Sequence, residues 1–166
     1  MQIGVAKTAG FCFGVNRAVN MLDKMLSQGK KVCTLGPIIH NNIVVEDFRE
    51  KGALIVDTPE EVPEGYNVVI RAHGVTKQVI SKLEQLGIDY VDATCPYVLK
   101  IHRIIKENSN ENNIVLIAGD ESHPEVCGFR SHCIGESFVF RNSQELTEIL
   151  ENYKYFYEKE IIVVAQ

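Results

Sequence analysis

Apolar residues recur along the chain with two alternating periods. Runs of three to five mostly β-branched residues indicate buried strands, and stretches with apolar residues three or four positions apart indicate amphipathic helices. Between residues 15 and 27, Val15, Ala18, Leu22 and Met25 fall on one helical face. The predicted strands are Ile3–Ala6, Val32–Leu35, Ala53–Val56, Val68–Arg71, Tyr90–Asp92, Ile114–Ala118, Phe138–Phe140 and Ile161–Ala165.

Helix-period segments lie between these strands, and several end at glycine, the usual helix stop. The predicted helices are Val15–Ser27, Asn42–Lys51, Thr76–Leu86, Tyr97–Asn108, a short helix within Pro124–His132, and a helix capped by Ser143 that ends near Asn152. Strands that alternate with helices predict parallel sheets covered by helices on both faces. We therefore predict an α/β fold of two similar three-layer α/β units with mostly parallel sheets, residues 1–95 and 96–166.

Composition narrows the class of protein. Of the 166 residues, 45% are hydrophobic and 23% are charged, which excludes a disordered tail, a collagen-like chain and a disulfide-dense miniprotein. The net charge of −5 predicts no general attraction to nucleic acid or to an acidic membrane. The apolar stretches are far shorter than the ~20 residues that span a bilayer, and the first residues lack the pattern of a signal peptide. We expect a cytoplasmic protein.

Five loops carry the residues that could take part in catalysis or binding, and each loop is predicted to follow a strand. They are residues 9–15, 35–41, 71–74, 92–96 and 119–126. In parallel α/β sheets, ligands bind beyond the carboxyl ends of the strands. The five loops are therefore expected to converge on one crevice.

The five cysteines are odd in number and widely spaced, which argues against a disulfide scaffold. Cys12 and Cys95 each stand at a predicted helix entry, where the helix dipole favours a thiolate. Two such thiolates could bind zinc or an iron–sulfur cluster, or each could be a small buried side chain. Cys33 lies inside a strand pattern and is predicted to be core. Cys127 and Cys133 are predicted to be inert thiols, with metal chelation as the alternative.

Three histidines, His40, His73 and His123, adjoin Gly, Asn or Pro in these loops. An imidazole there can donate a hydrogen bond to a phosphate and gain charge as the phosphate arrives. The other two histidines, His102 and His132, fall within helical segments and are predicted to lie at the surface.

Glu125 follows His123 by two residues at a predicted helix start. A carboxyl group held near anionic groups has a raised pKa and suits a general acid or a proton relay. The alternative is a solvated carboxylate that interacts with the helix dipole.

Short motifs follow one another through the five loops. They are Gly10–Val15 (GFCFGV), Gly36–Asn41 (GPIIHN), Ala72–Gly74 (AHG), Asp92–Pro96 (DATCP) and His123–Val126 (HPEV). In this order they resemble the successive motifs of the 4-hydroxy-3-methylbut-2-enyl diphosphate reductases, also called the LytB or IspH family. The resemblance covers nearly the whole chain.

The resemblance implies an oxidoreductase of the non-mevalonate isoprenoid pathway. It implies a [4Fe-4S] cluster bound by three cysteines, two of which correspond to Cys12 and Cys95, with one iron left for the substrate. A third ligand and a third α/β unit of the family's trefoil arrangement are missing from this chain, which reaches Gln166 at what resembles the start of a Gln-Thr-Thr segment. The chain is therefore expected to be an inactive N-terminal portion, incomplete at the C-terminus of its second unit.

The resemblance also implies roles for the other site residues. His40, His73 and His123 correspond to the family's diphosphate-binding histidines, and Glu125 corresponds to its proton donor. The substrate loses its hydroxyl group as water and gives isopentenyl and dimethylallyl diphosphate, with electrons from an external donor such as ferredoxin or flavodoxin. Two other classes stay open: a non-catalytic module that binds a phosphate ligand, and a zinc hydrolase with Cys and His ligands.

Overall fold

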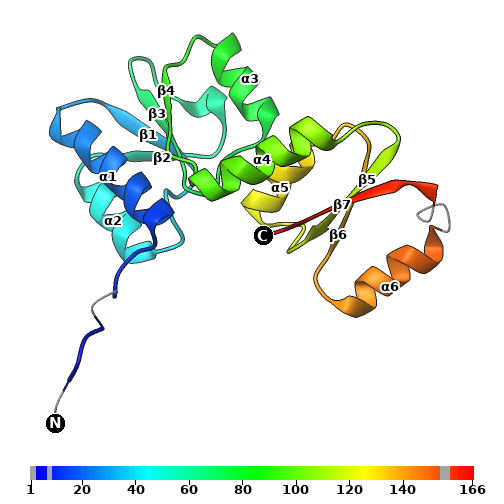
Figure 1. Ribbon diagram of the computed structural model, residues 1–166. Coiled ribbons are helices and arrows are strands. Elements are labelled where there is room, and N and C mark those ends of the chain that lie inside the picture. Colours follow the sequence, from blue (N-terminus) through cyan, green and yellow to red (C-terminus); the bar gives the residue numbers. More distant parts are fainter. Residues whose placement is uncertain (1–2, 7–8, 154–157) are drawn as a thin grey trace.

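Two parallel sheets organise the chain in the computed structural model, which describes residues 3–6, 9–153 and 158–166 (Figure 1). The first sheet has the strand order β2-β1-β3-β4, and the second has the order β6-β5-β7. Every pair of neighbouring strands is parallel. The strands are β1 (Val32–Leu35), β2 (Leu54–Val56), β3 (Asn67–Ile70), β4 (Tyr90–Asp92), β5 (Asn113–Ala118), β6 (Glu136–Phe140) and β7 (Glu160–Ala165).

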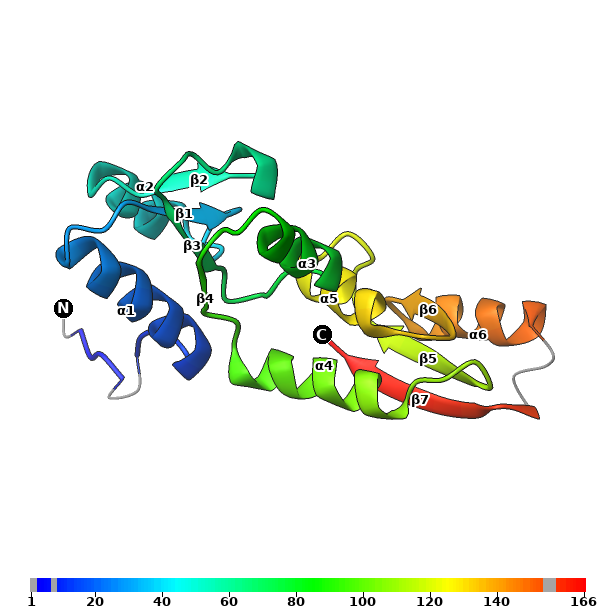
Figure 2. The ribbon, with the colours of Figure 1, turned by 90° about the horizontal axis from the view of Figure 1, so that it is seen from above.

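Helices cover both faces of each sheet, as Figures 1 and 2 show. The helices are α1 (Phe13–Ser27), α2 (Asn42–Glu50), the 3-10 helix η1 (Pro59–Glu61), α3 (Lys77–Gln85), α4 (Pro96–Asn108), α5 (Pro124–His132) and α6 (Ser143–Asn152). This arrangement confirms the predicted α/β class with two three-layer units. The boundary between residues 95 and 96 stays a prediction.

The side chains of the first sheet alternate between two cores, because successive residues of a strand point to opposite faces. Val32 and Val69 pack with Leu22 of α1 and Phe48 of α2. Their neighbours on the opposite face, Cys33 among them, pack against α3 and its surroundings. Cys33 is fully buried, which confirms its predicted place in the core.

The second sheet is built in the same way. Val115 and Ile117 of β5 pack against α4 and α5, where Phe129 is fully buried. Ile114 and Leu116 of the same strand face α6. The β-branched strand residues therefore form the middle layer, as their apolar pattern predicts.

Most element boundaries lie within two residues of the predicted ones, but three predictions are wrong. Ile3–Ala6 is not a strand, because a strand exists only through pairing and no described residue pairs with it; Ile3 and Val5 are 77% and 80% exposed. Residues 9–15 therefore do not follow a strand. The cap of α6 is Asn142 and not Ser143, since the Asn142 side chain accepts a hydrogen bond from the Glu145 amide at 3.0 Å.

The third wrong prediction is the surface position of His102, which is only 8% exposed. Its ring lies edge-on to Phe129, with 5.6 Å between centroids, and a Cβ atom added to Gly128 would stand 2.9 Å from Nε2. A helical histidine can thus be core when a glycine on the next helix leaves room for it. His132, also predicted at the surface, is half-buried.

The loops at the carboxyl ends of the first sheet are connected by backbone hydrogen bonds. The Ala72 amide donates to the Ile38 carbonyl at 3.1 Å, and the Cys95 amide donates to the Ala72 carbonyl at 2.8 Å. The loops after β1, β3 and β4 are thereby held side by side, because these strands are neighbours in the sheet. No helix within the described part of the chain is long and apolar enough to cross a membrane.

Candidate active site

Three imidazole rings meet where the two units adjoin. The ring centroids of His40 and His73 are 4.2 Å apart, and that of His123 lies 5.6 and 5.5 Å from them. One ring nitrogen from each histidine lies within 4.8 Å of the other two. The loops after β1, β3 and β5 thus bring together the three histidines that the sequence singled out, and we call them the histidine cluster.

The first two members of the histidine cluster stand in loops shaped by glycine. Gly36, with φ of +69°, turns the chain after β1, and a Cβ atom there would lie 2.6 Å from a guanidinium nitrogen of Arg71. Arg71 in turn donates from Nε to the Gly74 carbonyl at 3.2 Å, which closes the loop around His73. Only glycine combines this backbone angle with so close a contact.

The third member, His123, caps the N-terminus of α5. Its Nδ1 atom accepts a hydrogen bond from the Glu125 amide at 3.2 Å. The neutral ring therefore carries its hydrogen on Nε2. This tautomer leaves an N–H group free to donate to a ligand oxygen.

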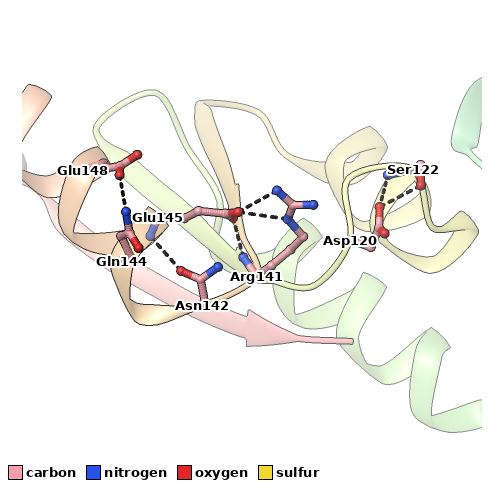
Figure 3. A network of polar contacts seen from close by, with 7 residues as sticks. All are labelled: Asp120, Ser122, Arg141, Asn142, Gln144, Glu145 and Glu148. Atoms are coloured by element: carbon pink, nitrogen blue, oxygen red, sulfur yellow. Dashed lines mark hydrogen bonds and ion pairs between the residues drawn. The ribbon is translucent and has the colours of Figure 1, made fainter.

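A polar network supports the loop that leads to His123 (Figure 3). Asp120 Oδ1 accepts hydrogen bonds from the Ser122 amide at 2.8 Å and from the Ser122 hydroxyl at 2.7 Å. Nearby, Arg141 donates from Nε and from a terminal guanidinium nitrogen to Glu145 at 3.0 and 2.6 Å. The charge of Arg141 also helps to lower the pKa of Asp120, after the two hydrogen bonds from Ser122. The loop is therefore braced before it reaches the histidine cluster.

Two members of the histidine cluster, His73 and His123, have lowered pKa values. Burial, and then the positive charges of His40, His123 and Arg71, lower the pKa of His73 to about 4. Burial also lowers the pKa of His123, partly opposed by Asp120. The Nδ1 atom of His73 is buried and has no hydrogen-bond partner among the described residues. A site of this kind favours an anion, because a negative ligand allows the rings to take up protons that they otherwise repel.

Arg71 is the site residue that sequence reasoning missed. Burial lowers the pKa of its guanidinium group, and its charge in turn lowers the pKa of both His73 and His123. No carboxylate forms an ion pair with it within the described ranges. Its place two residues before His73 was the available signal, but an arginine at a strand end is ordinary in sequence. The structure adds a half-buried cation behind the histidine cluster.

Glu125 is half-buried beside the histidine cluster. Burial raises the pKa of its carboxyl group, and the nearby charge of His40 partly opposes the rise. The direction agrees with the expectation for an acid, although burial is the cause here and not a neighbouring anion. Because the side chain is partly desolvated, a fully solvated carboxylate does not describe it.

Cys12 and Cys95 are the N-cap residues of α1 and α4, as predicted. The two helix ends lie against each other, since a Cβ atom on Gly14 would stand 2.5 Å from Cys95 Sγ. Arg17 fastens them by donating to the Thr94 and Asp92 carbonyls, each at 3.1 Å. Two thiols at converging helix N-termini suit two ligands of an iron–sulfur cluster, because the helix dipoles stabilise thiolates.

The other three thiols lie elsewhere. Burial raises the pKa of Cys33 to about 11 and also raises that of Cys133, whose sulfur donates to the Phe129 carbonyl at 3.5 Å. Cys127 donates to the Glu121 carbonyl at 3.6 Å. Cys33 and Cys133 are therefore poor thiolates, and the inertness of Cys127 stays a prediction.

The contact between Gly14 and Cys95 gives a first prediction. Gly14→Ala places a methyl group against the Cys95 side chain and should lower the free energy of unfolding by about 1–2 kcal/mol, within the usual cost of overpacking. Urea unfolding of the 166-residue chain measures this change. Gly4→Ala is the control, because its Cβ atom would meet nothing within 4 Å. Equal stability of the two variants would contradict a close contact between the helix ends.

A second prediction concerns pH. The pKa of His73 and that of His102 both fall from 6.5 to about 4 on folding. Between these values the unfolded chain binds more protons than the folded chain, so stability is lost as the pH falls from 6.5 toward 4. Urea midpoints over this range should decrease, with a smaller slope in His73→Asn. A midpoint that stays constant or rises on acidification would refute the lowered pKa values.

A sizeable cavity lies away from this site. It measures about 620 Å³ and lies near the amino ends of β3 and β4, between Pro59–Asn67 and Leu86–Asp89. None of the predicted site residues lines it. Cavity size therefore does not mark the chemistry of this chain, whereas the gathering of imidazoles and thiols does.

Comparison with protein families gives a match over almost the entire chain. The family described as LytB protein matches residues 3–166. The chain is 35% identical over 167 residues to the 4-hydroxy-3-methylbut-2-enyl diphosphate reductase of Clostridioides difficile (strain 630), covering 100% of this chain and 58% of that relative. It is 40% identical over 167 residues to the reductase of the same name from Anaeromyxobacter sp. (strain Fw109-5), covering 100% of this chain and 56% of the relative. The chain thus spans a little over half the length of these relatives.

Solved structures give the same result. The E-1-hydroxy-2-methyl-but-2-enyl-4-diphosphate reductase of Plasmodium falciparum superposes with a TM-score of 0.85 at 26% identity, covering 96% of this chain and 49% of that one. An (E)-4-hydroxy-3-methyl-but-2-enyl diphosphate reductase, described as the terminal enzyme of the non-mevalonate pathway, superposes with a TM-score of 0.77 at 34% identity. It is covered to 66%, and 98% of this chain takes part.

Proposed function

The chain belongs to the LytB protein family, and from this premise we propose that it supplies the N-terminal part of a 4-hydroxy-3-methylbut-2-enyl diphosphate reductase. The reaction breaks the carbon–oxygen bond of an allylic alcohol. Two electrons and two protons enter, the hydroxyl oxygen leaves as water, and isopentenyl and dimethylallyl diphosphate form. The observation that carries the proposal is the histidine cluster with Glu125 beside it.

The histidine cluster is proposed to bind the diphosphate group. Its rings are crowded, and burial lowers the pKa of His73 and of His123. No carboxylate forms an ion pair with these rings among the described residues. A diphosphate accepts hydrogen bonds from the rings and raises their pKa values, so the positive charge grows where the ligand needs it. Arg71 adds a permanent charge behind the rings. This local site lets a chain with a net charge of −5 attract a strongly anionic substrate.

Glu125 is proposed to deliver a proton. Its partial burial favours the protonated carboxyl group, which is the form a donor needs. The backbone amide of Glu125 donates a hydrogen bond to the His123 ring. The acid and the ring proposed to bind the diphosphate are therefore held close to each other. Placement at a helix start leaves the carboxyl group free to face the substrate.

Cys12 and Cys95 are proposed to hold an iron–sulfur cluster from the N-termini of α1 and α4. When bound, a [4Fe-4S] cluster supplies the electrons and a Lewis-acidic iron for the leaving oxygen. The role of the chain is to present two thiolates at dipole-stabilised positions and to keep them next to the loop that carries His73. An external donor such as ferredoxin or flavodoxin and a location in the cytoplasm stay predictions.

The alternative, a non-catalytic module that binds a phosphate ligand, would need only the histidine cluster. It gives no reason for two cysteines at converging helix ends. Replacement of Cys95 therefore separates the two functions.

A third prediction tests whether this chain suffices for catalysis. We expect the 166-residue chain, reconstituted anaerobically with iron and sulfide, to show no turnover and no stable EPR signal of a [4Fe-4S] cluster, because the described thiols provide two suitable ligands and not three. Iron analysis, EPR and an assay with a chemical reductant measure this. Robust turnover by the chain alone would refute the proposal that further residues are required.

A further inference from the structure

A second cavity lies at the junction of the two units. It has a volume of about 430 Å³ and is formed by α3, by the end of the first sheet and by α4, with His132 at the end of α5. None of its lining residues belongs to the histidine cluster. The Lys77 amide donates to the Ser131 hydroxyl at 3.1 Å, which ties the start of α3 to α5. We call this space the junction cavity; its volume is within the range of small-molecule sites.

The junction cavity has a positive rim. Lys77, Arg103 and Lys106 line it, and none of the three forms an ion pair among the described residues. Asp92 is its one carboxylate, and that side chain accepts a hydrogen bond from the Thr94 amide at 2.8 Å. A chain with a net charge of −5 thus gathers three unpaired cations around one cavity.

Two imidazoles stand in the wall of the same cavity. The rings of His102 and His132 are 4.5 Å apart, and Nε2 of His102 is buried with no hydrogen-bond partner among the described residues. Burial, then the charges of Lys77 and Lys106, lower the pKa of His132. His132 therefore lies in the positive field of two lysines, whereas the charge of Asp92 partly opposes the lowering of the His102 pKa.

Apart from Ser81 and Thr94, the remaining wall is apolar. Ile70, Val75 and Ile80 line the side formed by the first unit, and Leu99 lines the side formed by α4. Leu99 is 38% exposed. A ligand that only carried charge would leave this surface in contact with water, at a cost proportional to its area.

We propose that the junction cavity is a second binding site, separate from the histidine cluster, for a small phosphate ester with a short apolar substituent. The phosphate group contacts Lys77, Lys106 and His132, and the substituent lies against Ile80 and Leu99. The site lies across two units, so its ligand stabilises their contact. This inference does not depend on the proposed reductase activity.

The test follows the histidine ring signals of the 166-residue chain by NMR during titration with n-butyl phosphate and, separately, with inorganic phosphate. Saturable shifts of His102 and His132 with butyl phosphate are expected, with affinity for inorganic phosphate lower by about tenfold, since the butyl group buries apolar surface. The histidine cluster gives separate signals, so binding there is measured independently.

The variant Lys77→Gln/Lys106→Gln should lower the affinity for butyl phosphate, measured from the His132 signal, by about tenfold, because two charges beside the phosphate are lost. The matched control is Lys30→Gln/Lys100→Gln, which removes the same charge from exposed positions outside the cavity and should leave affinity unchanged. All four side chains are exposed, so the fold is expected to persist, and an unfolding curve checks this. Shifts confined to the histidine cluster, equal binding of the two phosphates, or equal effects of the two variants would overturn the proposal.

Discussion

In a full-length reductase that contains this chain, replacing Glu125 by Gln should lower turnover by at least about a hundredfold. The visible absorbance of the iron–sulfur cluster and the binding of the diphosphate substrate should both persist. Glutamine keeps the size of the side chain and its place at the start of α5. It removes only the proton that the carboxyl group can give.

The size of this effect follows from the environment of Glu125. Burial raises the pKa of the carboxyl group, so a larger fraction is protonated at a given pH than for an exposed glutamate. The backbone amide of Glu125 donates the hydrogen bond to His123, so this bond is unchanged in the variant. The loss should therefore appear in kcat, with KM little affected.

Glu111→Gln is the matched control, because Glu111 is exposed in a turn of the second unit and belongs to none of the site loops. Steady-state rates and equilibrium binding of the substrate, measured on both variants, separate the roles. Equal loss of cluster, binding and rate in Glu125→Gln would show that Glu125 is structural. Unchanged turnover would exclude it as the proton donor.

Local pattern was sufficient for most of the fold. The bounds of β1 and β4 coincide with the predicted ones, because each combines a clear apolar run with a nearby Gly or Pro. The histidine cluster was also predictable, since the carboxyl ends of parallel strands meet at one edge. His40 and His73 come from neighbouring strands β1 and β3, and His123 joins them from the second sheet.

Non-local contacts explain what the pattern could not supply. His102 was predicted at the surface as a polar residue in a helical segment, but Gly128 on another helix leaves room for its ring. Arg71 gains part of its influence from its position near His123, which is distant in sequence. Ile3–Ala6 has the composition of a strand, yet strand formation requires a partner outside the segment. In each case the deciding group lies far along the chain.

The same reasoning connects the fold to the proposed chemistry. The backbone hydrogen bonds that join Ile38, Ala72 and Cys95 place the loop with the proposed cluster ligand next to the two loops proposed to bind the diphosphate. The hydrogen bonds that Arg17 donates, and the absence of a side chain on Gly14, then allow the N-terminus of α1 to lie against Cys95. Thiolates and anion-binding groups would otherwise be difficult to hold together, because the ligand and the thiolates have charges of the same sign. The helix dipoles, together with the positive charge that His73 and His123 can take up beside a bound anion, reduce that repulsion.

Cys95→Ser should abolish the visible absorbance and the EPR signal of the cluster in the full-length reductase, and turnover should fall below detection. A serine hydroxyl is a poor ligand for iron in a cluster, whereas the cysteine thiolate is the usual one. The change is nearly isosteric, and the Cys95 backbone bond to Ala72 does not involve the sulfur. The fold should therefore persist, and unfolding curves of the iron-free protein check this.

Cys133→Ser is the matched control, since Cys133 is half-buried, stands at the C-terminal end of α5 and has no counterpart among the ligands that the resemblance implies. It should retain both absorbance and activity.

The three classes of function then give different results. A phosphate-binding module would bind pyrophosphate equally well in wild type and Cys95→Ser and would contain no iron. A zinc hydrolase would contain stoichiometric zinc that is lost in Cys95→Ser. Only a reductase loses iron, colour and turnover together, because one thiolate at the start of α4 supports all three.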